Sequence, residues 1–127
     1  MNQEREKCPI EIALDVVGGK WKVLILWYLL WETRRFSQLE RLIPQVSQKV
    51  LAEKLRELEE SGLIERKVYP VVPPRVEYFL TEGGQSIRPL LMAMLDWGNH
   101  YKKMTEDSQE STTMCKGIQL VLDDISK

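Results

Sequence analysis

The sequence contains little of the chemistry that most enzymes use. Its 127 residues include one histidine, His100, and two cysteines, Cys8 and Cys115. His100 has no serine or cysteine motif near it that could form a catalytic triad, and the three residues lack the spacing of metal ligands. Gly18-Gly19 and Gly83-Gly84 do not fit a phosphate-binding loop. We therefore expect a protein that is not an enzyme and that needs no metal and no cofactor.

Long hydrophobic runs are also missing. The longest, Val23 to Trp31, is far shorter than the roughly 20 residues of a membrane-spanning helix, and no signal peptide precedes it. The two cysteines lie far apart in the sequence, which is typical of a reducing compartment rather than of a disulfide scaffold. These absences predict a cytoplasmic protein that has no membrane partner.

The overall charge indicates little about binding partners, because 18 basic and 19 acidic residues nearly cancel. Their distribution is uneven. The segment 34–75 contains nine basic and six acidic residues, for a net charge of +3, whereas residues 76–127 contain five basic and eight acidic residues, for −3. A local excess of positive charge is what a DNA-binding surface requires. A solvated surface could carry the same charges without a partner, so that interpretation stays open.

Residues 36–62 carry start and stop signals for two helices. Ser37, with Glu40 three residues later, fits a capping box at the start of the first helix. Pro44 cannot continue that helix and predicts a tight turn. Ser47 then caps a second helix, which Ser61-Gly62 ends. Helix, short turn and helix together form the supersecondary unit typical of DNA-binding proteins.

Two strands are predicted directly after this unit. Residues 63–69 and 76–80 alternate between apolar and polar side chains, and the segment Pro70 to Arg75 between them is rich in proline, which cannot donate to a sheet. A hairpin in this place is the wing of a winged helix. The predicted fold is therefore mainly α with a small β-hairpin (α+β), a winged helix-turn-helix.

The exposed face of the second helix is short, polar and basic in its N-terminal half, which suits base edges and phosphates in a major groove. Any surface helix could show such a face, and the wing is what favours DNA. Lys20 and Lys22 follow Gly18-Gly19 at a helix start, where free amides could hold a phosphate; solvated lysines beside capping glycines remain the alternative. The candidate DNA-binding residues are Lys20, Lys22, Arg35, Ser37, Ser47, Gln48, Lys49, Ala52, Glu53, Arg56, Arg66, Lys67 and Arg75.

The flanking segments predict how the domain is completed. Pro9 suits the first turn of a helix, and Lys20 to Trp31 is apolar on almost every side and so belongs in the core. Beyond Pro89 the sequence carries more apolar surface than so small a domain needs, which favours a homodimer formed through terminal helices. The candidate interface residues are Leu90, Leu91, Met94, Leu95, Trp97 and Tyr101. We divide the chain into a mobile arm (1–7), a winged-helix and dimerisation domain (8–104) and a polar linker with a short amphipathic helix (105–127).

Several short motifs occur in order along the chain: Cys8-Pro9, Gly18-Gly19-Lys20-Trp21, Arg35-Phe36-Ser37-Gln38-Leu39, Ser47-Gln48-Lys49-Val50-Leu51, Leu55-Arg56-Glu57-Leu58, Ser61-Gly62-Leu63-Ile64, Pro73-Pro74-Arg75-Val76-Glu77-Tyr78, Leu80-Thr81 and Asp96-Trp97-Gly98. Together they resemble the HxlR family of winged-helix transcriptional regulators, relatives of the MarR type. The resemblance covers about residues 8–101. It implies a homodimer on an inverted-repeat operator, with the helix from Ser47 in the major groove and the wing in the minor groove.

The resemblance also points to Cys8. Some members of the family sense oxidants or electrophiles through an N-terminal cysteine, and a position at a helix start near Lys7 favours a thiolate. The alternatives are a small packing residue and a small-molecule effector bound between subunits, for which the sequence identifies no ligand. Two functions therefore stay open: a sequence-specific DNA-binding regulator, and a protein-interaction module on a winged-helix fold that does not read DNA sequence.

Overall fold

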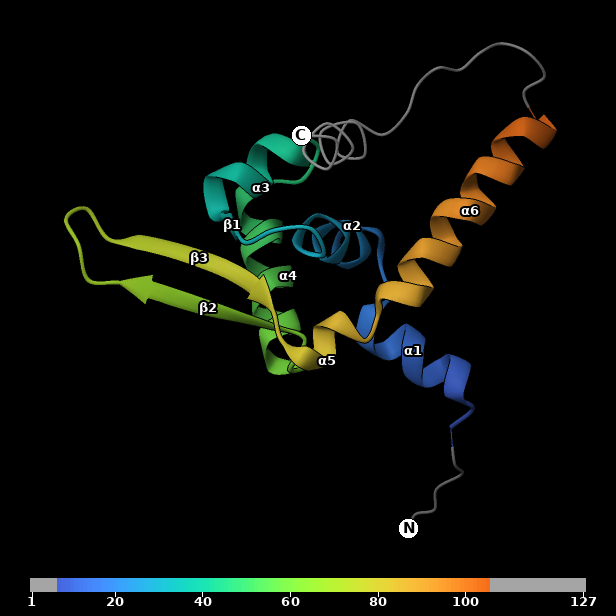
Figure 1. Cartoon of the computed structure of the whole chain (residues 1–127), viewed down its shortest axis with the longest axis horizontal. Coiled ribbons are helices and arrows are strands. Elements are labelled where there is room, and N and C mark those ends of the chain that lie inside the picture. Colours follow the sequence, from blue (N-terminus) through green and yellow to red (C-terminus); the bar gives the residue numbers. More distant parts are fainter. Residues whose placement is uncertain (1–6, 106–127) are drawn as a thin grey trace.

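The computed structural model describes residues 7–105 of the chain. Most of the predicted N-terminal arm and the predicted C-terminal amphipathic helix lie outside these residues. The elements in order are α1 (Pro9–Val17), α2 (Lys20–Leu29), β1 (Arg34–Arg35), α3 (Phe36–Leu42), α4 (Gln48–Glu60), β2 (Ile64–Tyr69), β3 (Arg75–Leu80), α5 (Glu82–Gln85) and α6 (Arg88–Thr105). Helices α2, α3 and α4 gather at the base of the sheet, the β2–β3 hairpin extends to one side, and α6 extends to the other (Figure 1). The prediction of a mainly α winged helix is confirmed.

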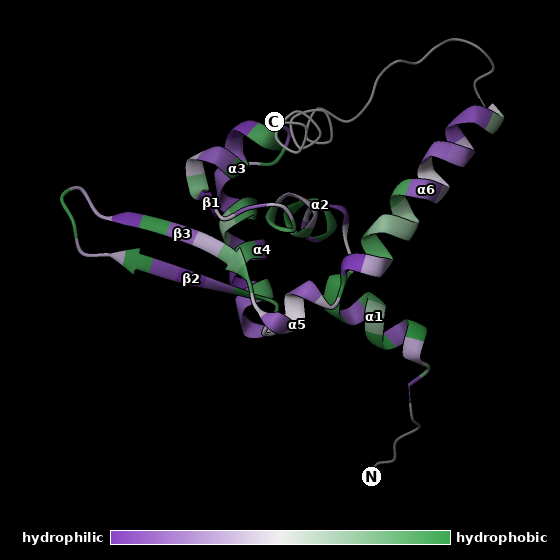
Figure 2. Cartoon of the chain, viewed as in Figure 1, coloured by the Kyte–Doolittle hydropathy of each residue, from purple (hydrophilic) through white to green (hydrophobic). Residues whose placement is uncertain are grey.

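Helix α2 forms the centre of the core. Ile25 and Leu26 are completely buried, and they share one cluster with Leu39 of α3 and with Leu51 and Leu55 of α4. A helix that is apolar on almost every side is stable only when other elements cover it on almost every side. In Figure 2, α2 is correspondingly one of the most hydrophobic ribbons and lies among the other helices. The sequence-based assignment of α2 to the core is therefore confirmed.

The start of α3 differs from the prediction. The helix begins at Phe36, and its N-cap is Arg35, whose backbone amide donates to Gln38 Oε1 at 2.8 Å. The predicted cap at Ser37 was therefore wrong by two residues. The cause is non-local: Arg35 belongs to β1 and lies opposite Glu77 of β3. This pairing holds Arg35 extended, so the helix begins directly after it.

The turn and the second helix of the unit are as predicted. Ile43 leaves the helical region at φ −125° and ψ 69°, just before Pro44. The hydroxyl of Ser47 accepts a hydrogen bond from the amide of Val50 at 3.1 Å and so caps α4. Gly62 takes φ +80°, the left-handed conformation that glycine adopts without steric cost. The chain can therefore turn from α4 into the wing within a few residues.

The wing is an antiparallel hairpin with a short third strand. Strands β2 and β3 pair from Ile64 opposite Leu80 to Tyr69 opposite Arg75. The two-residue strand β1 adds to the free side of β3, giving the order β1-β3-β2. The sequence patterns predicted β2 and β3 but not β1, because two residues are too few to show an alternation.

After the wing, Thr81 and Pro89 mark the starts of the last two helices. The Thr81 hydroxyl accepts from the amide of Gly84 at 3.0 Å and caps α5. Pro89 lies in the first turn of α6, where it disturbs no helical hydrogen bond. None of the helices within residues 7–105 is long and apolar enough to cross a lipid bilayer.

Candidate nucleic-acid interface

The N-terminal half of α4 presents the predicted polar face. Ser47, Gln48, Lys49 and Arg56 are exposed, and Ala52 and Glu53 are half-buried between them. Within residues 7–105, the side chains of Gln48, Lys49 and Arg56 make no hydrogen bond or ion pair. Their donors are thus available to an outside partner. Side chains of this kind on a helix start can reach base edges in a major groove.

The C-terminal half of α4 is instead fixed to the rest of the domain. Glu57 Oε1 lies 3.2 Å from Lys22 Nζ of α2 and 3.3 Å from Lys54 Nζ. Hydrogen bonds from these two ammonium groups, that of Lys22 first, lower the pKa of Glu57. Glu59 Oε2 lies 3.6 Å from Arg66 Nε on β2. Acidic residues therefore connect α4 to the core helix on one side and to the wing on the other.

This arrangement corrects the prediction for Lys22. The side chain was expected to contact a DNA phosphate, but only 9% of it is exposed and its ammonium is paired with Glu57. The reason is its helical position: Lys22 precedes Ile25 by three residues and Leu26 by four, so it lies on a buried side of α2. Lys22 is therefore a structural contact between α2 and α4.

Lys20 is exposed but lies on another part of the surface. Its ammonium is 4.8 Å from the centre of the Trp21 ring. The residue lines a hollow between α1, α2 and α6 rather than a surface shared with the wing. The structure thus groups Lys20 with the predicted dimer face, and not with the other candidate DNA contacts.

The wing carries its cations close to one aromatic ring. The Lys67 ammonium lies 5.1 Å and the Arg75 guanidinium carbon 4.5 Å from the centre of the Tyr69 ring. Arg75 Nε is also 3.4 Å from Glu77 Oε2. Sequence reasoning selected both cations and missed Tyr69 and Glu77. The available signal was the strand alternation, which places Lys67 and Tyr69 on one face of the hairpin.

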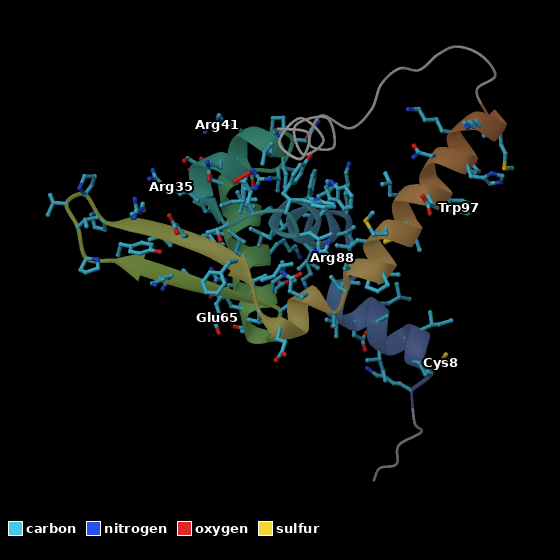
Figure 3. All side chains as sticks on the ribbon, in the orientation of Figure 1. Cys8, Arg35, Arg41, Glu65, Arg88 and Trp97 are labelled. Atoms are coloured by element: carbon cyan, nitrogen blue, oxygen red, sulfur yellow. The ribbon has the colours of Figure 1, made fainter. Side chains whose placement is uncertain are left out.

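The start of α3 lies against the wing. Arg35 and Ser37 line a hollow of about 520 Å³ together with residues 71–76 of the hairpin. Figure 3 shows Arg35 on the side of the molecule from which the wing extends, far from Cys8. The structure thus brings Arg35, Ser37 and Arg75 together, although they are up to 40 positions apart in the sequence.

The opposite side of the molecule carries the predicted dimer residues. Leu90, Met94, Trp97 and Tyr101 are exposed, and the last two stack at 5.1 Å between ring centres. Leu91 was assigned to this surface incorrectly: only 3% of it is exposed, because it packs into the core of its own subunit. Leu95 is half-buried and packs against the same core.

Helix α1 adds to this apolar surface. Ile10 and Leu14 are 69% and 62% exposed, and with Leu90 and Met94 they line a hollow of about 800 Å³ between α1, α2 and α6. Cys8 is the N-cap of α1 and has an exposed free thiol, so it is not a packing residue within the subunit. The Lys7 ammonium expected near this thiol is bound to Asp15 instead.

Comparison with known proteins gives one consistent result. Residues 16–106 match the family described as HxlR-like helix-turn-helix. An HTH-type transcriptional regulator of Methanothermobacter thermautotrophicus, itself uncharacterised, is 49% identical over 110 residues, which cover 87% of this chain and 84% of that protein.

Solved structures agree with this result. The redox regulator HypR in its reduced form is 40% identical, with a TM-score of 0.75 over 80% of this chain and 100% of that chain. Diamide-treated YodB from Bacillus subtilis is 37% identical, with a TM-score of 0.63 over 76% of this chain and 97% of that chain. With the helix-turn-helix and wing described above, these matches show that the chain belongs to the HxlR-like helix-turn-helix family of transcriptional regulators.

Proposed function

We propose that this protein regulates transcription as a homodimer that reads an inverted-repeat operator, with α4 of each subunit in a major groove and each wing in the adjacent minor groove. The observation that carries the proposal is the difference between the two halves of α4. The N-terminal half offers donors that have no partner within residues 7–105, whereas Glu57 and Glu59 fix the other half to α2 and β2. The net charge of +3 on residues 34–75 favours the phosphate backbone.

Within this proposal the candidate residues divide into two roles. Gln48, Lys49 and Arg56, with Ser47, Ala52 and Glu53 beside them, face the base edges. Arg35, Ser37, Lys67 and Arg75 contact backbone or minor groove around the wing. Arg66 contributes less, because Glu59 already neutralises part of its charge. Contacts of the first kind specify sequence, and contacts of the second kind set position and affinity.

Competitive selection from random duplex DNA, followed by titration at several salt concentrations, tests this division. Replacing Gln48, Lys49 and Arg56 by alanine should reduce discrimination between selected and random DNA, by about 1–3 kcal/mol for each side chain that hydrogen-bonds well to a base. Replacing Arg35 by alanine should weaken binding to all DNA sequences alike. It should also reduce the slope of log affinity against log salt concentration by about 1 per half-site. Lys103→Ala is the matched control, because this exposed lysine lies near the far end of α6.

Two outcomes would contradict the proposal. An unchanged sequence preference in the triple alanine variant would show that another face reads the bases. Failure of the wild-type protein to bind any duplex in a salt-dependent way would favour the alternative of a protein-interaction module on the same fold.

The homodimer part rests on the spacing of the exposed apolar residues of α6. Leu90, Met94, Trp97 and Tyr101 recur at i, i+4, i+7 and i+11 and so form one stripe along the helix. The exposed Ile10 and Leu14 of α1 continue this stripe across the hollow that both helices line. A surface of this size on a small domain is suited to a second copy of itself. Two-fold symmetry then places the half-sites about 10 base pairs apart, centre to centre.

The effector part rests on Cys8. Its thiol is exposed at the start of α1, two residues before Ile10 of the surface assigned to the dimer, and similar proteins include a redox regulator and one studied after diamide treatment. We propose that oxidation of Cys8 changes the relative position of the two recognition helices. Diamide takes two electrons and two protons from two thiols, which join as a disulfide with a second Cys8 or with Cys115, a residue outside the described part of the chain.

Operator binding by wild type and Cys8→Ser, before and after diamide, tests this role. Treatment should release wild type only, and dithiothreitol should restore its binding. Non-reducing electrophoresis of Cys115→Ser identifies the partner of the disulfide. Equal binding in all four samples would remove Cys8 from the mechanism and leave the DNA-binding proposal unchanged.

A further inference from the structure

We infer that Tyr69 is a positioning residue of the wing: its ring holds the Lys67 ammonium and the Arg75 guanidinium together, so that both cations reach the DNA backbone as one unit. This inference rests on the proposed function, because it assigns how the proposed wing contact is built.

The strand register places the three side chains on one face of the hairpin. Tyr69 lies directly opposite Arg75 in the pairing of β2 with β3. Lys67 precedes Tyr69 by two residues, and side chains two apart in a strand point to the same face. The tip, residues 70–74, lies beyond the last pair of this ladder. Tyr69 and Arg75 are therefore the last paired residues before the tip.

The distances show that the ring contacts both cations. The Lys67 ammonium is 5.1 Å and the Arg75 guanidinium 4.5 Å from its centre, within the roughly 6 Å at which a cation is attracted by an aromatic face. Two positive groups beside one ring repel each other. Glu77, opposite Lys67 in the register and 3.4 Å from Arg75 Nε, removes part of that repulsion.

This arrangement matters because long basic side chains are costly to order. A free lysine or arginine loses rotamer entropy when it binds a phosphate, and a contact formed beforehand reduces that loss. Tyr69 is half-buried and has few rotatable bonds, so it is a rigid support for both neighbours. The ring therefore raises DNA affinity through Lys67 and Arg75 without a contact of its own.

Four variants of the full-length protein test this inference: Tyr69→Leu, Tyr69→Phe, the double variant Lys67→Ala/Arg75→Ala, and this double variant with Tyr69→Leu added. The measurement is affinity for the selected operator as a function of salt, with thermal unfolding to show that each variant is folded at the assay temperature. Tyr69→Leu keeps an apolar side chain but removes the aromatic face, and Tyr69→Phe keeps that face.

We expect Tyr69→Leu to weaken operator binding by about three- to tenfold near physiological salt, the range of one to two exposed cation–π contacts. The double variant should show a salt slope that is lower than that of wild type by about two per half-site. The salt slope of Tyr69→Leu should lie between those of wild type and the double variant. Tyr69→Phe should bind like wild type. Tyr69→Leu should weaken the double variant no further, because the ring acts only through the two cations.

Several results would overturn the inference. If Tyr69→Leu binds like wild type while the double variant binds more weakly, the ring has no role in DNA binding, although Lys67 and Arg75 still contact the DNA. Equal losses for Tyr69→Phe and Tyr69→Leu would assign the effect to the hydroxyl. A further loss when Tyr69→Leu is added to the double variant would make Tyr69 a direct contact. A double variant that binds like wild type would overturn the proposed wing contact itself.

Discussion

Large hydrophobic residues are buried in the winged-helix body, which runs from α2 to α5, but many of them are exposed on the helices α1 and α6. In the body, Ile25, Leu39 and Leu51 are completely buried and belong to one core. On α1 and α6, large residues such as Ile10 and Trp97 are more than half exposed. Figure 2 shows hydrophobic segments on both helices, although α6 extends away from the body. The body completes its own core, whereas α1 and α6 leave large apolar side chains exposed, as the proposed dimer requires.

The largest expected effect comes from charging that surface. Met94→Glu combined with Trp97→Glu should give folded monomers at micromolar concentration, because a carboxylate buried without a partner costs several kcal/mol. Operator binding should fall with the dimer. Sedimentation equilibrium measures the assembly and circular dichroism the fold. Asp96→Ala changes an exposed residue on another side of α6 and should remain a dimer. A double variant that still sediments as a dimer would place the interface elsewhere.

The next largest effect comes from comparing a buried and an exposed residue of α6. Leu91→Ala should lower the free energy of unfolding by about 2–5 kcal/mol, because this side chain is buried in the core of its own subunit. Met92→Ala, at the adjacent and exposed position, should change it by less than about 0.5 kcal/mol. Urea unfolding at one fixed protein concentration measures both. Similar losses in the two variants would mean that α6 is buried on more than one side.

The smallest effect concerns how ion pairs hold α4 against α2. The Lys22 and Lys54 ammonium groups lower the pKa of Glu57 in the folded state. The stabilisation is therefore present above the ordinary glutamate pKa and is lost as the pH falls through the lower pKa of the folded protein. Glu57→Gln should be less stable than wild type at neutral pH, and the difference should shrink in acid.

Urea unfolding between neutral pH and about pH 3, across the usual glutamate range, measures this convergence. Glu60→Gln is the control, since Glu60 is exposed and has no partner in residues 7–105. A constant difference between wild type and Glu57→Gln across this range would assign the effect to packing rather than to charge.

Much of the fold followed from short-range signals. Pro9, Ser47 and Gly62 were placed correctly at helix ends because a cap involves groups only a few residues apart. The central position of α2 followed from its composition. The candidate DNA-binding face followed in part: Gln48, Lys49 and Arg56 are exposed as expected, whereas Lys22 is not.

The sequence by itself therefore determined the winged-helix class, the order of the elements apart from β1, and the helix caps apart from that of α3, since each depends on local hydrogen bonds or on the period of apolar residues. Only the tertiary structure decided which side of a helix is covered. Lys22 and Leu91 each lie on a helix with apolar residues on several sides, where periodicity does not select the buried one. The start of α3 at Phe36 likewise depends on β1 pairing with β3, about 40 residues later. Contacts between distant segments form only when the chain is folded, so no local pattern encodes them.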